Sequence, residues 1–300
     1  HLVPMTATPP GGERDVIHLD AEDRNNPTLG RRLVASKTAE LSQKSSVASA
    51  VVDAVRRITK NKPTAVGVIV NRVTTAKEVF CALQKRLPNA AVELVIGSMR
   101  PIDRESQTAR LQRLVGPDRP NVTDQTSVIV ATQCLEVGAD FDFDALVTEC
   151  ASLDALRQRF GRLNRGGRDI DAGALIIAAN RDVKPEEKLD DKKPLDPIYG
   201  NSATRTWNWL SEHAQDGCVD FGVNALTDLL SEQAQPGRVP VGLLAPSASA
   251  NAPVLLPAYL DCWCQTAPRP MPEPDVSLFL HGPQSGEPDV QVCWRADLVD

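Results

Sequence analysis

A row of arginines in the middle of the chain has the clearest chemical meaning. Five arginines lie between Arg157 and Arg168, in the segment LDALRQRFGRLNRGGR. Phosphoryl transfer spreads negative charge over the γ-phosphate oxygens, and an arginine from a neighbouring domain stabilises that charge, typically by ~10³–10⁵ in rate. Arg162 and Arg165 are three residues apart, so we expect them to point the same way from one helical turn. A surface helix with solvated or salt-bridged arginines is the alternative.

A second polar segment, ATQCLEVGAD, begins at Ala131, 37 residues before Arg168, where a strand-like apolar run ends. Thr132 follows the run, so its hydroxyl and N–H could bind a nucleic-acid phosphate. Asp140 could accept from a ribose hydroxyl or orient an arginine. Glu136 is a candidate coupling residue, and Gly138 permits the turn. The alternative is a capped turn in which Asp140 serves only as the cap.

Two earlier segments also place polar side chains after strand-like runs. VGVIVNRVTTA carries Asn71 and Thr74, and IGSMRPIDRE carries Ser98, Arg100 and Arg104. Short polar side chains and arginines are good contacts for nucleic-acid phosphates, so we assign these five residues to nucleic-acid binding. They would serve equally well as caps of the helices that follow.

The elements that position these residues alternate along the chain. Continuous apolar runs predict buried parallel strands, over Ala65–Val70, Ala90–Ile96, Ser127–Ala131, Ala145–Val147 and Gly173–Ala179. Helical spacing of apolar residues predicts helices between them, over Lys37–Lys60, Thr75–Leu87, Asp103–Leu114 and Leu153–Phe160. The alternation predicts an α/β fold with a parallel sheet flanked by helices. Ligands of such sheets gather at the carboxyl ends of the strands, where the polar segments lie.

A charged, proline-flanked run, RDVKPEEKLDDKKPLDP, indicates a boundary after the predicted sheet. We predict three parts: residues 1–36 as the end of a preceding linker, 37–185 as the α/β domain, and 186–300 as a mixed, mainly helical accessory region. Within the last part, helices are expected from Thr206 and over Asn224–Ala234. We interpret Trp207 and Trp209 as core residues rather than as aromatic side chains on which nucleic-acid bases stack.

Composition limits the classes of function. The net charge of −6 is not that of a stand-alone nucleic-acid binder, so any such contact should be local. No apolar run approaches the roughly 20 residues that span a bilayer, so no membrane is expected as a partner. Seven cysteines, an odd number, favour a reducing, cytoplasmic compartment. Cys262 and Cys264 lack a second pair nearby, and we predict no metal site.

The segments ATQCLEVGADFDFD and QRFGRLNRGG resemble motifs V and VI of superfamily 2 helicases, and among these the CRISPR-associated helicase of type I systems. The order of DPIYG, TWNWL and FLHGP after them is similar too. The resemblance implies a RecA-like second motor domain that works with a first motor domain of the same protein. It also implies single-stranded DNA and an RNA-guided CRISPR surveillance complex as partners.

The resemblance assigns roles to individual residues. Arg162 and Arg165 would be the arginine fingers, the catalytic residues. Gln158 and Arg159 would contact the nucleotide or bridge to the first motor domain. The ATP interface would also include Gly138 and Asp140, and Thr132 would lie at the DNA backbone.

Expected features of a complete motor are missing from this sequence. It contains no G-x-x-x-x-G-K-[ST] segment, no D-E-x-[DH] box, and no histidine followed by aspartate. We therefore expect ATP and Mg²⁺ to be bound mainly by a first motor domain in a longer protein, and this chain alone to be inactive. Two alternatives remain open at this point: a DNA or RNA helicase outside CRISPR, or a non-catalytic interaction module that kept the fold.

Overall fold

The computed structural model describes residues 21–60, 62, 64–97, 101–117, 119, 125–136, 140–231, 241–244, 256–265 and 271. The chain divides into two compact units, residues 1–245 and 246–300. The described part of the second unit contains one helix, α9 (Pro257–Cys264). The first unit contains the sheet and the polar segments that follow its strands.

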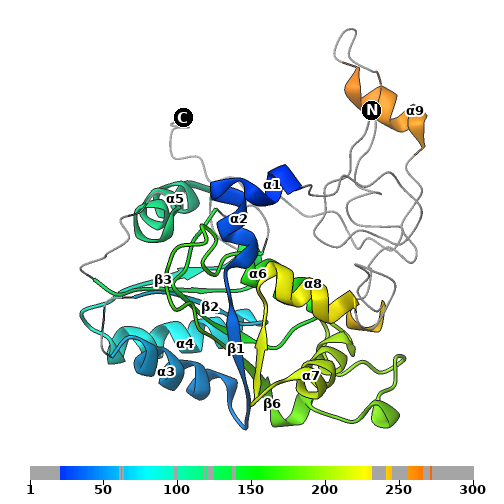
Figure 1. The fold of residues 1–300 in the computed structure, drawn as a ribbon, viewed down its shortest axis with the longest axis horizontal. Helices are drawn as coiled ribbons and strands as arrows, with labels where there is room; N and C mark the ends of the chain where they lie inside the picture. Colours follow the sequence, from blue (N-terminus) through cyan, green and yellow to red (C-terminus); the bar gives the residue numbers. More distant parts are fainter. Residues whose placement is uncertain are drawn as a thin grey trace, which may run out of the picture. The chain divides into compact units, whose positions relative to one another are not determined.

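The first unit is built on a seven-stranded sheet in the order β3-β4-β2-β5-β6-β1-β7 (Figure 1). Strands β1 to β6 are parallel, and only β7 runs antiparallel to its neighbour β1. The strands are β1 (Thr38–Lys44), β2 (Ala65–Ile69), β3 (Ala91–Val95), β4 (Ser127–Ala131), β5 (Ala145–Glu149), β6 (Ala174–Ala179) and β7 (Cys218–Asp220). The predicted α/β class with a parallel sheet is confirmed.

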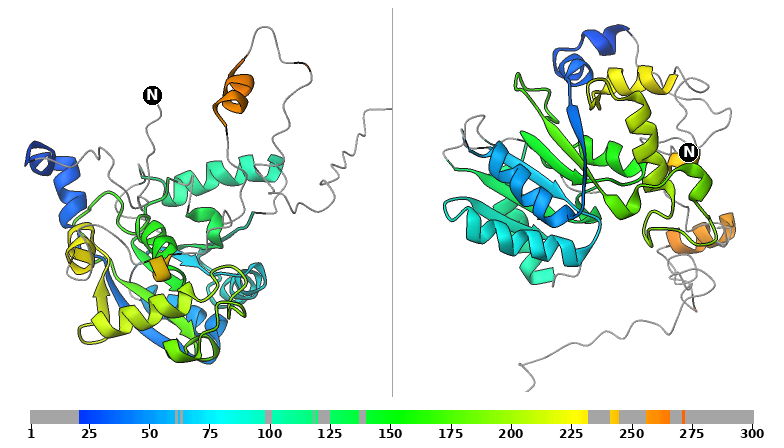
Figure 2. Two further views of the ribbon diagram at one scale, coloured as in Figure 1. Left: turned by 90° about the vertical axis from the view of Figure 1, so that its right-hand side faces the viewer. Right: turned by 90° about the horizontal axis from the view of Figure 1, so that it is seen from below.

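Helices cover both faces of this sheet. One face carries α3 (Val47–Ile58) and α4 (Val73–Arg86), which lie side by side in Figures 1 and 2. The other carries α5 (Pro101–Val115), α6 (Leu153–Phe160), α7 (Ser202–His213) and α8 (Val223–Ser231). Two short helices, α1 (Ala21–Asn25) and α2 (Pro27–Val34), precede β1, and short 3₁₀ turns are η1 (Gln133–Leu135), η2 (Asn180–Asp182), η3 (Glu186–Lys188) and η4 (Val241–Leu243).

Strands β2 and β4 read as continuous apolar runs because both faces of the sheet are buried there. In β2, Val66 and Val68 belong to the core under α3 and α4, whereas Ala65 and Ile69 belong to the core on the opposite face. Successive strand residues point to opposite faces, so a strand covered on both sides needs apolar residues at every position. The same two-sided burial holds throughout β4.

The predicted helix over Lys37–Lys60 is wrong in its first part, because Thr38–Lys44 forms strand β1. Ala39 is fully buried on the strand while its neighbours are exposed, and the strand pairs in parallel with β6 from Ala39 to Lys44. Helix α3 begins only after Ser46, whose hydroxyl accepts from the backbone N–H of Ser49 at 3.3 Å. Tertiary pairing thus overrides the apparent helical spacing here.

Residues beyond the predicted boundary also contribute to the first unit. Strand β7 extends the sheet beyond β1, and Phe221 stacks on Phe160 of α6 with ring centroids 3.9 Å apart. Helix α7 buries Trp207 and Trp209 against the same core. The first compact unit runs to residue 245, and the assignment of residues 186–300 to an accessory region stays a prediction. No helix among the described residues has both the length and the apolar character to cross a bilayer.

Candidate nucleotide and nucleic-acid interface

The structure brings the polar segments together at the carboxyl edge of the sheet. Asn71 follows β2, Gln133 follows β4, and Glu149 ends β5. The carbonyl of Asn71 accepts from Gln133 Nε2 at 2.9 Å, and its N–H donates to Glu149 Oε2 at 2.7 Å. Because these three strands are adjacent and parallel, side chains at their carboxyl ends meet without any long-range rearrangement of the backbone.

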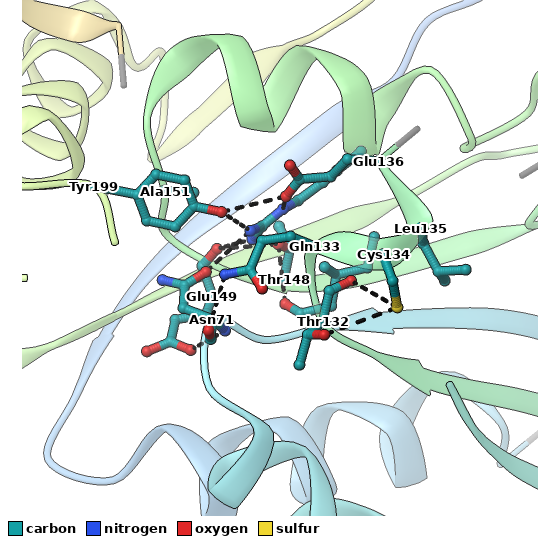
Figure 3. Close-up of polar contacts among 12 residues, drawn as sticks. Asn71, Thr132, Gln133, Cys134, Leu135, Glu136, Thr148, Glu149, Ala151 and Tyr199 are labelled. Atoms are coloured by element: carbon teal, nitrogen blue, oxygen red, sulfur yellow. Dashed lines mark hydrogen bonds and ion pairs between the residues drawn. The ribbon is translucent and has the colours of Figure 1, made fainter. Parts of the chain in front are cut away.

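Arg159 of α6 is the centre of this cluster. Its side chain is completely buried, and all five of its N–H groups donate hydrogen bonds. Figure 3 shows several of its partners drawn together beneath Tyr199. The acceptors are Glu136 Oε1 at 2.9 Å, Thr148 Oγ1 at 2.9 Å, the Glu149 carbonyl at 2.9 Å, Asn71 Oδ1 at 3.0 Å and the Tyr199 hydroxyl at 2.8 Å.

Because its N–H donors are all used within the protein, Arg159 is limited in what else it can bind. A guanidinium whose five N–H groups are all engaged inside the protein has none left to donate to a nucleotide. In this structure Arg159 therefore joins the ends of β2 and β5 to η1. The role expected from the sequence, a contact to the nucleotide or a bridge to the first motor domain, stays a prediction.

Asn71 and Thr132 are likewise more enclosed than expected of nucleic-acid contacts, since each is only 5% exposed. The side-chain amide of Asn71 donates to the Cys150 carbonyl at 2.7 Å and accepts from Arg159. The Thr132 hydroxyl lies 3.8 Å from the Cys134 thiol. Thr74, by contrast, is exposed in the first turn of α4.

Glu136 links the buried cluster to Arg162. Its carboxylate accepts from Arg159 Nε and, at 3.3 Å, from the Tyr199 hydroxyl. Its backbone carbonyl accepts from Arg162 at 3.0 Å, and the neighbouring Leu135 carbonyl accepts from Arg162 Nε at 3.3 Å. One residue therefore binds two arginines of the row, one through its side chain and one through its backbone.

Arg162 and Arg165 do not lie on one helical turn, so that expectation is wrong. Helix α6 ends at Phe160, and the following loop is pinned to residues before β5 by the pairing of Leu163 with Phe143. Arg162 is half-buried, and burial together with the charge of Arg165 lowers the pKa of its guanidinium. Arg165 forms a 2.8 Å ion pair with the exposed Asp140.

The loop over residues 161–168, here called the arginine loop, is held by two polar side chains. Asn164 has a positive φ of 40°, which asparagine tolerates better than most residues. Its side chain accepts from the Arg168 N–H at 2.8 Å and donates to the Arg168 carbonyl at 3.0 Å. The buried Asp142 accepts from the N–H groups of Arg165 at 2.9 Å and Gly166 at 3.3 Å.

Sequence reasoning missed several of these supports. Arg168 forms ion pairs with Asp142 at 3.0 Å and Asp144 at 2.7 Å. The alternating FDFD pattern could have indicated them, because its phenylalanines and aspartates point to opposite sides of an extended chain. Lys37 was also missed: it donates to the Phe160 carbonyl at 2.9 Å, and burial lowers its pKa to about 8.

The remaining predicted site residues are described only in part or not at all. Gly138, Ser98 and Arg100 lie outside the described residues. Arg104 belongs to α5, but its side chain is not among those described. Gln158 is half-buried near the end of α6.

Comparison with solved structures places this fold in a class. It resembles the crystal structure of a CRISPR-associated protein, with a TM-score of 0.50 and 18% identity over 79% of this chain and 27% of that chain. It also resembles T. fusca Cas3 with ADP, with a TM-score of 0.51 and 19% identity over 66% of this chain and 24% of that chain. The mostly parallel sheet of this chain therefore shares the RecA-like fold of these structures.

Sequence comparison then shows which family this part of the chain resembles. Residues 62–168 match the family model described as CRISPR-associated nuclease/helicase Cas3, C-terminal. The CRISPR-associated helicase Cas3 of Thermoproteus tenax is 36% identical over 213 residues, which cover 62% of this chain and 35% of that protein. The endonuclease/helicase Cas3 of Thermus thermophilus is 35% identical over 124 residues, 39% of this chain and 13% of that protein.

The predicted resemblance to the CRISPR-associated helicase is therefore confirmed. The chain spans about a third or less of the length of these two relatives.

Proposed function

We propose that this chain supplies the second motor domain of an ATP-dependent Cas3-type DNA helicase, with Arg162 and Arg165 as its arginine fingers. The observation that carries the proposal is the set of partners around Arg162. Its guanidinium is held by the neutral carbonyls of Leu135 and Glu136, and no carboxylate among the described residues forms an ion pair with it. A positioned cation without a fixed counter-ion suits the negative charge that develops on a transferred phosphoryl group.

Arg165 complements Arg162 from the same loop. Its ion pair with Asp140 is solvent-exposed, with the two side chains 39% and 56% accessible. Exposed pairs contribute little, about 0–1 kcal/mol, so a triphosphate could replace Asp140 as the partner of Arg165 at small cost. We therefore assign Asp140 to holding Arg165 in place before the nucleotide arrives.

For the nucleotide itself, we propose that a first motor domain binds most of ATP and Mg²⁺. T. fusca Cas3, whose fold this chain shares, has been crystallised with ADP. Among the described residues of this chain, no group of three or more His, Cys, Asp or Glu side chains is arranged to hold a metal ion. The arginine loop would then complete the ATP site from the opposite side of the interface, and Gln158 and Gly138 would border it.

Single-stranded DNA is the nucleic-acid partner that we propose. Thr74 is exposed in the first turn of α4, where free backbone N–H groups suit a phosphate. We also propose Ser98, Arg100 and Arg104, which follow the β3 segment in the sequence, as contacts for DNA phosphates. Thr132 would contribute mainly through its backbone, because its side chain is enclosed.

We further propose an RNA-guided CRISPR surveillance complex as the assembly that delivers the DNA. The support is the family model together with the CRISPR-associated relatives. Recognition of that complex would have to involve parts of the protein beyond the arginine loop, since the hydrogen bonds described here are made within the domain.

The test is Arg162→Ala in the complete protein that carries this chain. We expect ATP turnover with single-stranded DNA to fall at least tenfold, while DNA affinity changes less than about twofold, because the arginine acts on transition-state charge. Arg57→Ala is the matched control, since Arg57 is 64% exposed on α3, which covers the opposite sheet face. Undiminished DNA-stimulated hydrolysis in Arg162→Ala would show that the arginine-finger assignment is wrong.

A further inference from the structure

Tyr199 enters the buried cluster from outside the helicase motifs. It lies forty residues after Arg159, in the turn that precedes α7, yet it is only 4% exposed. Figure 3 shows its hydroxyl directed toward Glu136. The hydroxyl accepts from Arg159 at 2.8 Å and donates to Glu136 Oε1 at 3.3 Å, so it bonds to both members of the buried ion pair.

The turn that carries Tyr199 is fixed in its own right. One oxygen of Asp196 accepts from the N–H groups of Ile198 and Tyr199, each at 2.8 Å. The backbone closes through an Asp196–Gly200 bridge, in which Gly200 takes a positive φ of 62° that glycine adopts freely. The other Asp196 oxygen pairs with Arg72 at 3.4 Å, next to the carboxyl end of β2. The tyrosine is therefore presented by a pre-formed turn docked on the motor.

We propose that Tyr199 is a positioning residue that couples the segment after the arginine loop to the ATP interface. Its hydroxyl fixes the Glu136 carboxylate, and the backbone carbonyls of Leu135 and Glu136 in turn hold Arg162. A change at this turn therefore reaches Arg162 through two hydrogen-bonded steps that are joined by the covalent frame of Glu136. The inference rests on the proposed function, because it assumes that Arg162 acts on ATP.

The chemistry of the hydroxyl fits this role. Burial raises the pKa of the Tyr199 phenol to about 12, so it remains a proton donor to Glu136 throughout the neutral range. The Arg159 guanidinium also lies 5.9 Å from the centre of the Tyr199 ring, which is within reach of a cation–π interaction. A phenylalanine would keep the ring contact and lose the hydrogen bonds of the hydroxyl, so Tyr199→Phe separates positioning from packing.

The experiment compares Tyr199→Phe with Tyr259→Phe in the complete protein. Tyr259 is the other tyrosine of this chain and is 43% exposed, so its hydroxyl serves as the matched control. We expect Tyr199→Phe to lower kcat for DNA-stimulated ATP hydrolysis at least fivefold, with KM for ATP changed less than twofold. Tyr259→Phe should retain wild-type values. Thermal melting of both variants shows whether the folded fraction is unchanged under the assay conditions.

A second variant tests whether Tyr199 acts through Glu136. If it does, the losses in Tyr199→Phe and Glu136→Gln are not additive, and the double variant is less than about twofold slower than Glu136→Gln alone. Additive losses, an unchanged kcat in Tyr199→Phe, or a loss explained by unfolding would each overturn the inference. A wild-type protein without DNA-dependent hydrolysis would remove the proposed function and this inference together, whereas an active wild type with an unaffected Tyr199→Phe would remove only the latter.

Discussion

Replacing Arg159 by methionine is expected to destabilise the first unit strongly, although no ligand is involved. Methionine keeps an unbranched stem but supplies none of the five N–H donors. Glu136, whose side chain is only 12% exposed, would lose its buried cationic partner. Breaking a buried ion pair by removing one member typically costs about 3–5 kcal/mol, because the other charge stays buried without compensation. The acceptors of Asn71 and Thr148 would also lose their donor.

The measurement is urea unfolding of this chain, followed by the fluorescence of the buried Trp207 and Trp209 in α7. For a unit of this size, each kcal/mol corresponds to roughly 2–4 °C in Tm, so thermal melting should show a fall of about 6–20 °C. Arg57→Met is the matched control: it breaks an exposed ion pair with Glu40 and should cost less than about 1 kcal/mol. A loss below about 1 kcal/mol for Arg159→Met would refute the saturated, buried arrangement of this side chain.

Substitutions at Lys37, Asp142 and Asn164 test the supports of the arginine loop. Lys37→Met removes an amine whose pKa is lowered to about 8 from 10.5. Between these two pH values the unfolded chain binds more protons than the folded chain, so the free energy of unfolding of the wild type rises with pH. Relative to the variant it should rise by about 2 kcal/mol from pH 7.5 to 9.5, measured by urea unfolding at each pH. Asp142→Asn should lower the free energy of unfolding by about 2–4 kcal/mol in the same assay, because Asp142 is buried and bonds to the arginine loop. Asp140→Asn, which changes an exposed ion pair, should lower it by less than about 1 kcal/mol. Equal effects of the two substitutions would contradict the structure. Asn164→Ala should be less stable than Asn164→Gly by about 1 kcal/mol, because alanine resists a positive φ; the reverse order in thermal melting would exclude that backbone conformation.

The sequence predicts those parts of the fold in which a strand is covered on both faces of the sheet, because its apolar pattern is then visible within the segment itself. Ala65–Ile69 and Ser127–Ala131 are apolar at nearly every position, and only a covered parallel strand requires that pattern. Strand β1 escaped prediction because its sequence, TAELSQK, has few apolar residues and is fixed by pairing with β6 far along the chain. Periodicity within a segment carries no information about such a partner.

The sequence located residues of the candidate site, but it did not predict the contacts that each of them makes. The motif spacing located Arg159 and Arg162, but it could not show that one is saturated by internal acceptors and the other is held only by carbonyls. That difference depends on where the ends of other strands lie. Tyr199 could not be found for the same reason, since its partners Glu136 and Arg159 are separated from it by 63 and 40 positions.

Strand β7 protects one edge of the sheet. Its three residues, Cys218–Asp220, pair antiparallel with Thr38–Glu40 of β1, which would otherwise present unpaired N–H and C=O groups to solvent. Exposed strand edges recruit other chains and lead to aggregation. A truncation chosen from the helicase motifs alone, ending near residue 185, would remove this protecting strand together with Phe221, which stacks on α6. Soluble production of the domain should therefore retain residues through α8, which ends at Ser231.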